Sequence, residues 1–95
     1  MSEVQHDKEN KKFYITVNGK EAHMNYRHQD EATVEYHHTY SPPELRGSGV
    51  AGKVVRAALE WARSQNLKVI PTCSYVVSFV RRHPEYQDIA DLKES

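Results

Sequence analysis

Three glycines stand within the seven residues Arg46–Gly52, directly before a run that is rich in alanine and valine. A glycine in a helix interior costs about 1 kcal/mol relative to alanine, so this spacing indicates a turn. A turn that leads into a helix presents free backbone N–H groups together with the positive end of the helix dipole. The stretch therefore predicts a binding site for an anion such as a phosphate group.

Two common phosphate-binding loops do not fit this stretch. The G-x-x-x-x-G-K-[ST] loop needs a spacing and a lysine that are missing here. Gly47, Gly49 and Gly52 match the spacing of the G-x-G-x-x-G dinucleotide fingerprint, but that loop opens a parallel unit, whereas this one follows strands predicted to be antiparallel. The loop alone predicts an anion site without naming the anion.

The residues before the loop have the pattern of an antiparallel sheet. Phe13–Val17 and Glu21–Arg27 alternate apolar and polar side chains, and Asn18-Gly19 between them is a strong hairpin signal. Thr33–Tyr40 is a third strand, rich in β-branched and aromatic residues. Period-two alternation predicts that one of its faces carries Val34, Tyr36, His38 and Tyr40.

The residues after the loop predict a helix, a strand and a second helix. Lys53–Gln65 has apolar residues at helical spacing, Leu67–Ile70 is a short strand that Pro71 interrupts, and Tyr75–Arg82 is a second helix. A strand, a crossover helix and a further strand form a right-handed unit. Leu67–Ile70 is therefore expected to run parallel to Thr33–Tyr40, which gives an α+β fold.

Length and composition predict one small domain. The chain has 95 residues, and we expect a loose lead-in over 1–11, a single domain over 12–92 with a last helical turn at Glu85–Leu92, and a polar tail over 93–95.

The 13 basic and 13 acidic residues cancel, which argues against binding nucleic acid by general phosphate attraction. No apolar run is long enough to span a membrane, and no histidine spacing matches a metal site. A single cysteine fits a cytoplasmic protein, and an edge strand at Phe13–Val17 fits a monomer or a weak dimer.

Several blocks of the sequence resemble one family. The turn resembles the [QR]-x-x-G-x-[GA] signature of the GNAT acyltransferase superfamily, through Arg46, Gly49 and Ala51. In that superfamily the backbone amides of this loop hold the pyrophosphate of acetyl-CoA. Three runs are similar, in the same order, to minimal GNAT-like proteins that contain little more than the CoA-binding half of the fold: His38–Gly47, Leu67–Ser74 and Arg81–Tyr86. The resemblance spans about residues 13–88.

The resemblance implies a small GNAT-like fold, with three antiparallel strands, a parallel fourth strand and helices on both faces of the sheet. In this fold the two parallel strands splay apart where the signature helix begins, and the pantetheine arm of the cofactor lies in the gap. The gap would fall here between residues 37–40 and 69–73. The acetyl-CoA contacts that the resemblance implies are His38, Thr39, Tyr40, Arg46, Gly47, Ser48, Gly49, Val50, Ala51, Gly52, Cys73, Tyr75, Arg81 and Arg82.

The resemblance also indicates candidates for the chemistry. Cys73 follows the fourth strand, where the thioester is expected, and the minimal proteins carry a cysteine at the matching position; it is an acyl-relay nucleophile or a thiol that lines the pocket. Glu35 matches the general-base glutamate of histone-type enzymes, and the alternative is a solvated carboxylate. His38 is a hydrogen-bonded core histidine or a proton-transfer group. Tyr75 and Tyr86 donate a proton to the leaving thiolate or only pack.

These residues support three hypotheses for function. The first is an N-acetyltransferase that moves an acetyl group from acetyl-CoA to an amine, on a small molecule or a protein lysine. The second is a module that binds CoA or acyl-CoA without turnover, since the segments that shape the acceptor site in larger relatives are missing. The third is a structural domain that binds a partner and uses the glycine loop only as a turn.

Overall fold

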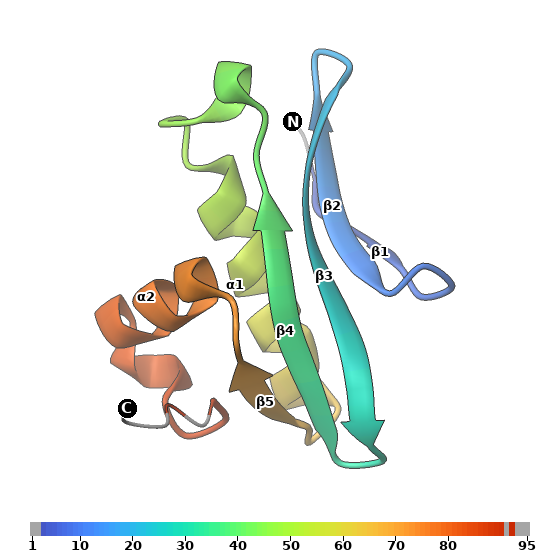
Figure 1. The fold of residues 1–95 in the computed structure, drawn as a ribbon, viewed down its shortest axis with the longest axis vertical. Helices are drawn as coiled ribbons and strands as arrows, with labels where there is room; N and C mark the ends of the chain where they lie inside the picture. Colours follow the sequence, from blue (N-terminus) through green and yellow to red (C-terminus); the bar gives the residue numbers. More distant parts are fainter. Residues whose placement is uncertain (1–2, 91, 93–95) are drawn as a thin grey trace.

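The computed structural model describes residues 3–90 and 92 and shows a mixed sheet of five strands with two α-helices (Figure 1). The strands lie in chain order, antiparallel from β1 to β4, and β5 is parallel to β4. Their bounds are β1 Gln5–Asp7, β2 Lys12–Val17, β3 Lys20–Asp30, β4 Thr33–Tyr40 and β5 Lys68–Pro71. The helices are α1 Val50–Ser64 and α2 Ser74–Arg82, with two short 3-10 helices, η1 Pro43–Leu45 and η2 Pro84–Tyr86.

The predicted topology, antiparallel strands followed by one parallel strand, is confirmed. The β2–β3 hairpin turns at Asn18 and Gly19, whose φ angles are 51° and 77°, as a turn with two left-handed residues requires. The first helix begins at Val50, earlier than predicted, because Gly49 takes the N-cap position. Gly52 therefore belongs to the first turn of α1 rather than to the loop.

The amino-terminal segment corrects one prediction. Its polar composition predicts a loose lead-in, whereas Gln5–Asp7 forms β1 against β2. His6 explains the difference, because its ring stacks on Phe13 at 4.0 Å and its Nε2 lies 2.6 Å from the Tyr26 hydroxyl. A long-range aromatic contact thus fixes a strand that local composition does not favour.

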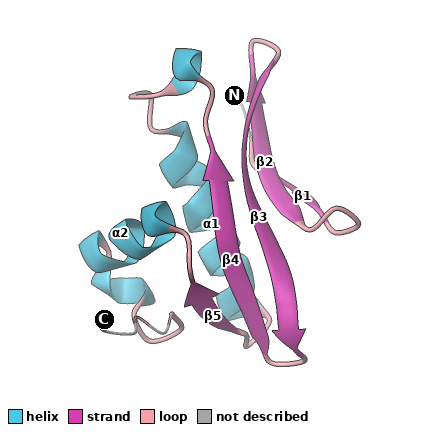
Figure 2. Ribbon diagram, in the orientation of Figure 1, coloured by secondary structure: helices cyan, strands magenta, loops and turns pink. Residues whose placement is uncertain are grey.

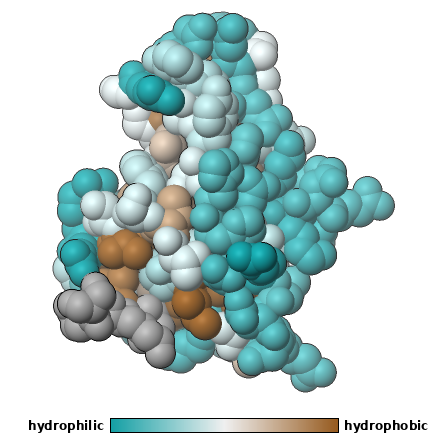
Figure 3. All heavy atoms as spheres, in the orientation of Figure 1, coloured by the Kyte–Doolittle hydropathy of each residue, from teal (hydrophilic) through white to brown (hydrophobic). Residues whose placement is uncertain are grey.

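The two helices pack on the sheet at different places. α1 contacts β2, β3 and β5, while α2 contacts β4, β5 and α1. In the view of Figure 1, α1 lies behind the sheet and α2 lies beside β4 and β5, and Figure 2 shows the same arrangement by secondary structure. The side chains buried along α1 recur at helical spacing: Val50, Val54, Val55, Ala58, Leu59 and Ala62. The opposite, outward face of β3 and β4 is partly exposed and largely hydrophilic (Figure 3).

A bulge in β4 changes which side chains face the core. Tyr36 pairs with Tyr26 of β3, but His38, not His37, pairs with the next residue, Asn25. His37 is therefore the extra residue of a β-bulge. One inserted residue reverses the alternation of everything that follows it on the strand.

The prediction that His38 and Tyr40 share a face with Val34 and Tyr36 is therefore wrong. Both side chains are exposed, whereas Val34 and Tyr36 are fully buried. Thr39 instead lies opposite buried Met24 and is itself half-buried. The bulge places Thr39 on the interior side of the strand.

The carboxyl-terminal residues form less helix than predicted. The expected turn over Glu85–Leu92 is limited to η2. The chain then turns so that Ala90 bridges to Val69 of β5, and the Val69 N–H donates to the carbonyl of Ile89 at 2.7 Å. This bridge satisfies the free edge of β5 in place of a further helical turn. The predicted tail over 93–95 lies outside the described residues.

Candidate functional site

The parallel pair β4–β5 ends early and leaves a gap. Its last paired residues are Tyr36 and Pro71. The N–H groups of Thr72 and Cys73 both donate to the Tyr36 carbonyl, at 3.1 and 3.2 Å, and the chain then leaves the sheet for α2. Within the described part of the chain, residues 37–40 have no strand partner on this side. Their backbone groups are available to an extended ligand.

The glycine turn ends in the exposed start of α1. Gly47 and Gly49 have φ angles of 84° and 85°, and a Cβ built on either would meet no atom within 4 Å. The left-handed backbone, and not crowding, is what favours glycine here. No side chain caps the helix, and its first internal bond runs from Lys53 N–H to the Gly49 carbonyl at 3.1 Å. The N–H groups of residues 50–52 thus have no acceptor within the helix.

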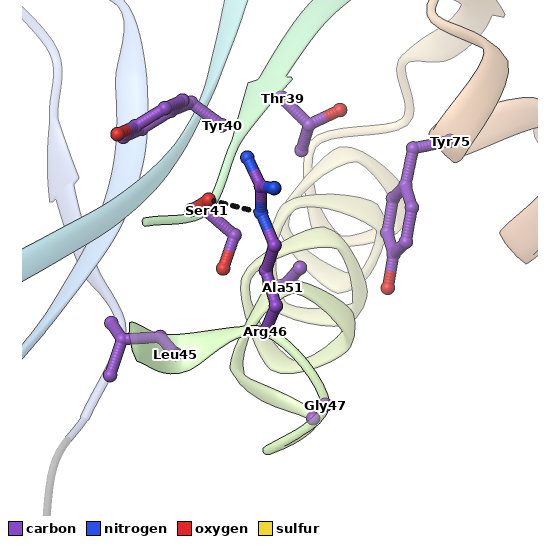
Figure 4. A pocket seen from close by; sticks show the side chains of 9 residues that line it. Thr39, Tyr40, Ser41, Leu45, Arg46, Gly47, Ala51 and Tyr75 are labelled. Atoms are coloured by element: carbon purple, nitrogen blue, oxygen red, sulfur yellow. Dashed lines mark hydrogen bonds between the residues drawn. The ribbon is translucent and has the colours of Figure 1, made fainter. Parts of the chain in front are cut away.

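A cavity of about 640 Å³ joins the glycine turn to the end of β4 and the start of α2 (Figure 4). This volume is in the range of small-molecule sites, roughly 300–1,000 Å³. The residues that line it are Thr39, Tyr40, Ser41, Leu45, Arg46, Gly47, Gly49, Ala51 and Tyr75. Residues of β4, the glycine turn and α2 therefore line a single cavity.

Arg46 and Ser41 give the cavity its polar side chains near the turn. The Arg46 Nε–H donates to the Ser41 carbonyl at 3.0 Å, and in Figure 4 the guanidinium extends between Tyr40 and Thr39. The Ser41 Oγ is buried and has no hydrogen-bond partner among residues 3–90 and 92. A buried hydroxyl without a partner is destabilising, so a polar ligand group that bonds to it would restore the loss.

Cys73 lies next to this cavity, just after β5. Its Sγ is 2.7 Å from the Oγ1 of Thr39, which lines the cavity. The thiol is half-buried, and Cys73 takes the N-cap position of α2. The structure therefore brings the candidate nucleophile into contact with a residue that lines the cavity.

Glu35 is placed on the outward face of the sheet and does not line the cavity. Its carboxylate accepts hydrogen bonds from Thr72 Oγ1 at 2.7 Å, Arg27 Nε at 2.8 Å and Gln29 Nε2 at 2.8 Å. The Thr72 hydroxyl, followed by the Arg27 guanidinium, lowers the pKa of this carboxyl. A carboxylate already bound to three donors is a weak general base.

The other predicted proton-transfer groups lie in different places, and not all of them border the cavity. His38 is exposed on the outward side, with its ring 5.9 Å from that of His23. Tyr75 lines the cavity, and its hydroxyl oxygen is 3.6 Å from the position of a Cβ built on Gly52. The buried Tyr86 donates to the Glu60 carboxylate at 2.6 Å, away from the cavity lining. Of these tyrosines, only Tyr75 borders the candidate site.

Several predicted cofactor contacts do not reach the cavity wall. Arg81 and Arg82 are exposed in the last turn of α2, while Tyr75 lies in its first turn. The Ser48 hydroxyl donates to the Leu45 carbonyl, and the Val50 side chain is buried in the core. At the turn, Ser48 and Val50 can therefore offer a ligand only their backbone groups.

Sequence reasoning missed two lining residues, Ser41 and Leu45. Both lie within the run His38–Gly47 that resembles the family, but neither is among the acetyl-CoA contacts that the resemblance implies. Their position directly before the turn was the available signal, since a short connection must follow the same surface as the elements that it joins.

Comparison with known proteins identifies the family. A family model described as GCN5-related N-acetyl-transferase matches residues 12–89. The chain belongs to the GCN5-related N-acetyltransferase family. Protein NATD1 of Danio rerio is 34% identical over 87 residues, covering 87% of this chain and 79% of that protein. Protein NATD1 of Homo sapiens is 31% identical over 92 residues, covering 95% of this chain and 81% of that protein.

A solved structure supports the same assignment. A GCN5-like protein from Staphylococcus aureus, determined by NMR, superimposes with a TM-score of 0.77 at 34% sequence identity, covering 97% of this chain and 90% of that one. The GNAT-like fold predicted for this N-acetyltransferase family member is therefore confirmed. Among the described residues, no helix is both long and apolar enough to cross a membrane, and no group of three or more His, Cys, Asp or Glu side chains is arranged to hold a metal ion.

Proposed function

We propose that this member of the N-acetyltransferase family binds acetyl-CoA in the cavity at the glycine turn and transfers its acetyl group to an amine. One observation carries the proposal: the uncapped start of α1 and the gap between β4 and β5 open onto the same 640 Å³ cavity. A ligand that fits both features has an anionic group at one end and an extended polar arm at the other. Acetyl-CoA has this shape and chemistry.

The residues of the turn fit a pyrophosphate group. Backbone N–H groups at 50–52 point out of the positive end of the α1 dipole, and positive φ at Gly47 and Gly49 leaves open space in front of them. Arg46 lines the same space and adds a cation to it; among the described residues, its one hydrogen bond runs from Nε–H to the Ser41 carbonyl. The unpartnered Ser41 hydroxyl supplies one further group for a polar ligand.

The gap fits the arm of the cofactor. Residues 37–40 of β4 offer unpaired backbone N–H and C=O groups at the edge where β5 has turned away. An amide-containing arm that pairs with this edge would lie in the position of a strand. When bound, acetyl-CoA would supply an activated thioester carbonyl, and Cys73 is the thiol at this gap, because its N–H and Sγ contact Tyr36 and Thr39 of β4.

Cys73 acts as an acyl relay in this proposal. Its Sγ takes the acetyl group and then releases it to the acceptor amine. Tyr75 borders the same space, where its hydroxyl would hydrogen-bond to the departing CoA sulfur. The acceptor is an amine of a small molecule or a protein lysine.

Calorimetry with acetyl-CoA tests the proposal. If the turn and the gap act together, acetyl-CoA should give heat of binding with a stoichiometry of one. Buffer without CoA and pantetheine alone should not give this heat. Absence of both heat and a thermal shift would overturn the proposal and leave the structural-domain hypothesis.

One observation favours a second candidate, a module that binds acetyl-CoA without turnover. Glu35 faces away from the cavity and is held by three donors, and among the described residues no carboxylate or histidine lines the cavity. Release of free thiol with a panel of amines and basic peptides separates the two candidates. Binding without thiol release for any acceptor would favour the module.

A further inference from the structure

We propose that Thr39 is a positioning residue for Cys73, whose hydroxyl holds the sulfur toward the incoming thioester and exchanges a hydrogen bond with it during acyl transfer. The inference rests on the acyl relay proposed above and adds the group that the relay needs. It is carried by a contact between two residues that lie 34 positions apart, one at the end of β4 beyond its last pairing with β5 and the other at the N-cap of α2.

The β4 bulge is what aims Thr39 inward. If β4 had no bulge at His37, regular alternation from buried Tyr36 would point the side chain at position 38 inward and the side chain at position 39 outward. With the bulge, Thr39 lies opposite buried Met24 and lines the cavity. A β-branched side chain is also stiff about χ1, so its hydroxyl has few alternative directions.

Hydrogen bonds hold the backbone of Cys73 in place, but they do not restrain its side chain. Its N–H donates to the Tyr36 carbonyl at 3.2 Å, and its own carbonyl accepts the Val77 N–H of α2 at 3.0 Å. These bonds hold the backbone on both sides and leave χ1 as the remaining freedom. In the described part of the chain, Thr39 is the one side chain that hydrogen-bonds to the Cys73 sulfur, so it decides where the sulfur points.

The hydrogen bond can serve each stage of the reaction. In the resting thiol, S–H donates to the Thr39 oxygen. As Sγ forms its bond to the acetyl carbon and the bond from that carbon to the CoA sulfur breaks, the thiol proton passes to the CoA sulfur, and the Thr39 O–H turns to donate to Cys73 Sγ. When the amine attacks the acetyl-cysteine, the N–C bond forms, the C–Sγ bond breaks, and the amine proton returns to Sγ. No further reactant is required.

Thr39→Val and Thr39→Ser test the inference together. Valine keeps the size and the branching of the side chain but removes the hydroxyl, whereas serine keeps the hydroxyl. Cys73 is the only cysteine of the chain, so iodoacetamide alkylation followed by mass spectrometry reports on it alone, without any cofactor. Acetylation of Cys73 by acetyl-CoA is measured on the same samples.

We expect Thr39→Val to slow both alkylation at pH 7 and acetylation about tenfold, the size of one hydrogen bond to a charged group. Thr39→Ser should restore both rates to within threefold. Thr33→Val, a half-buried threonine on the outward face of the same strand, is the matched control and should change neither rate.

Equal alkylation rates in Thr39→Val and the parent would overturn the inference. Failure of the relay itself is distinguishable from this result. If the parent binds acetyl-CoA and is never acetylated on Cys73, while the alkylation ratio is as expected, then the contact is real and the acyl relay is wrong. Thermal unfolding of each variant separates a general loss of structure from the specific effect.

Discussion

The two ends of the candidate site are built in different ways. At the glycine turn, the proposed phosphate end, the groups offered to a ligand are backbone N–H groups beside the positive φ angles of Gly47 and Gly49. At the thiol end, the group is a side chain, and its direction depends on Thr39 and on a bulge in β4. The first end is determined by a few consecutive residues, whereas the second depends on pairing between distant segments. Binding and chemistry should therefore respond to different substitutions.

The largest expected effect is a loss of acetyl transfer, without a loss of binding, when the thiol of Cys73 is removed. Cys73→Ala should lower acetyl transfer by about 100-fold or more, because it removes the nucleophile of the proposed relay, while the affinity for acetyl-CoA stays within about threefold. Steady-state thiol release and calorimetry on the same preparation measure the two quantities. If the alanine variant transfers acetyl as fast as the parent, the amine attacks the thioester directly and Cys73 only lines the pocket.

The converse effect is expected at the phosphate end. Gly49→Ala places a methyl group in the open space in front of the α1 amides and strains a left-handed backbone, so acetyl-CoA affinity should fall about tenfold by the loss of one or two hydrogen bonds. Gly19→Ala is a matched control, because Gly19 has a similar φ of 77° and equally empty surroundings but lies in the β2–β3 turn.

Both alanine variants should lose about 1–2 kcal/mol of unfolding free energy from the same backbone strain, as urea denaturation would show. Only Gly49→Ala should lose binding. An equal loss of affinity in the Gly19 variant would mean that general destabilisation, and not the turn, controls binding.

The contrast between the two ends also explains what the sequence could predict. The glycine turn, the Asn18-Gly19 hairpin and the parallel β5 all follow from local residue types and from the handedness of a crossover, and each is present. The bulge at His37 has no such local signal, because the residues 37–40 are polar or aromatic on either face. Alternation therefore assigned His38 to the core and left Thr39 outside it, the reverse of what the structure shows.

Strand β1 could not be predicted for a related reason. Its three residues are polar, and they are held by His6 through contacts with Phe13 and Tyr26, and through an edge-on contact with Trp61 of α1 at 4.8 Å. The partners come from three other elements, so no sequence window contains them. Long-range side-chain contacts, and not propensity, decide both β1 and the thiol end of the site.

The β1 contact predicts a pH effect that belongs to neither end of the site. Burial, and to a lesser degree Lys8, lowers the pKa of His6, while Asp7 raises it. The unfolded chain therefore binds a proton more readily than the folded one, and stability that is complete above the usual histidine pKa is lost as pH falls below about 6.5. His6→Phe, which keeps an aromatic ring but cannot titrate, should lose less stability between pH 7 and pH 5 than the parent.

Thermal unfolding of both proteins at each pH measures this difference, and the comparison cancels the titration of the other histidines. At pH 7, His6→Ala should cost about 1 kcal/mol from the lost aromatic contacts, without a change in the affinity for acetyl-CoA. Parallel pH dependence in the parent and in His6→Phe would show that His6 does not control the stability of β1.

The smallest expected effect concerns the outward carboxylate that the family resemblance offered as a base. Glu35→Gln keeps an acceptor for Thr72 but removes the charge that Arg27 faces, so the rate of acetyl transfer should change by less than about threefold, far below the 10²–10⁴-fold expected for a general base. Thr72→Val removes the shortest hydrogen bond to the same carboxylate and is the matched control on the rate. A loss of 100-fold in Glu35→Gln, with binding intact, would mean that the acceptor approaches from the outward face and that the base acts through the gap between β4 and β5. The thiol end of the site would then extend through the sheet, and the acceptor and the cofactor would meet from opposite sides of it.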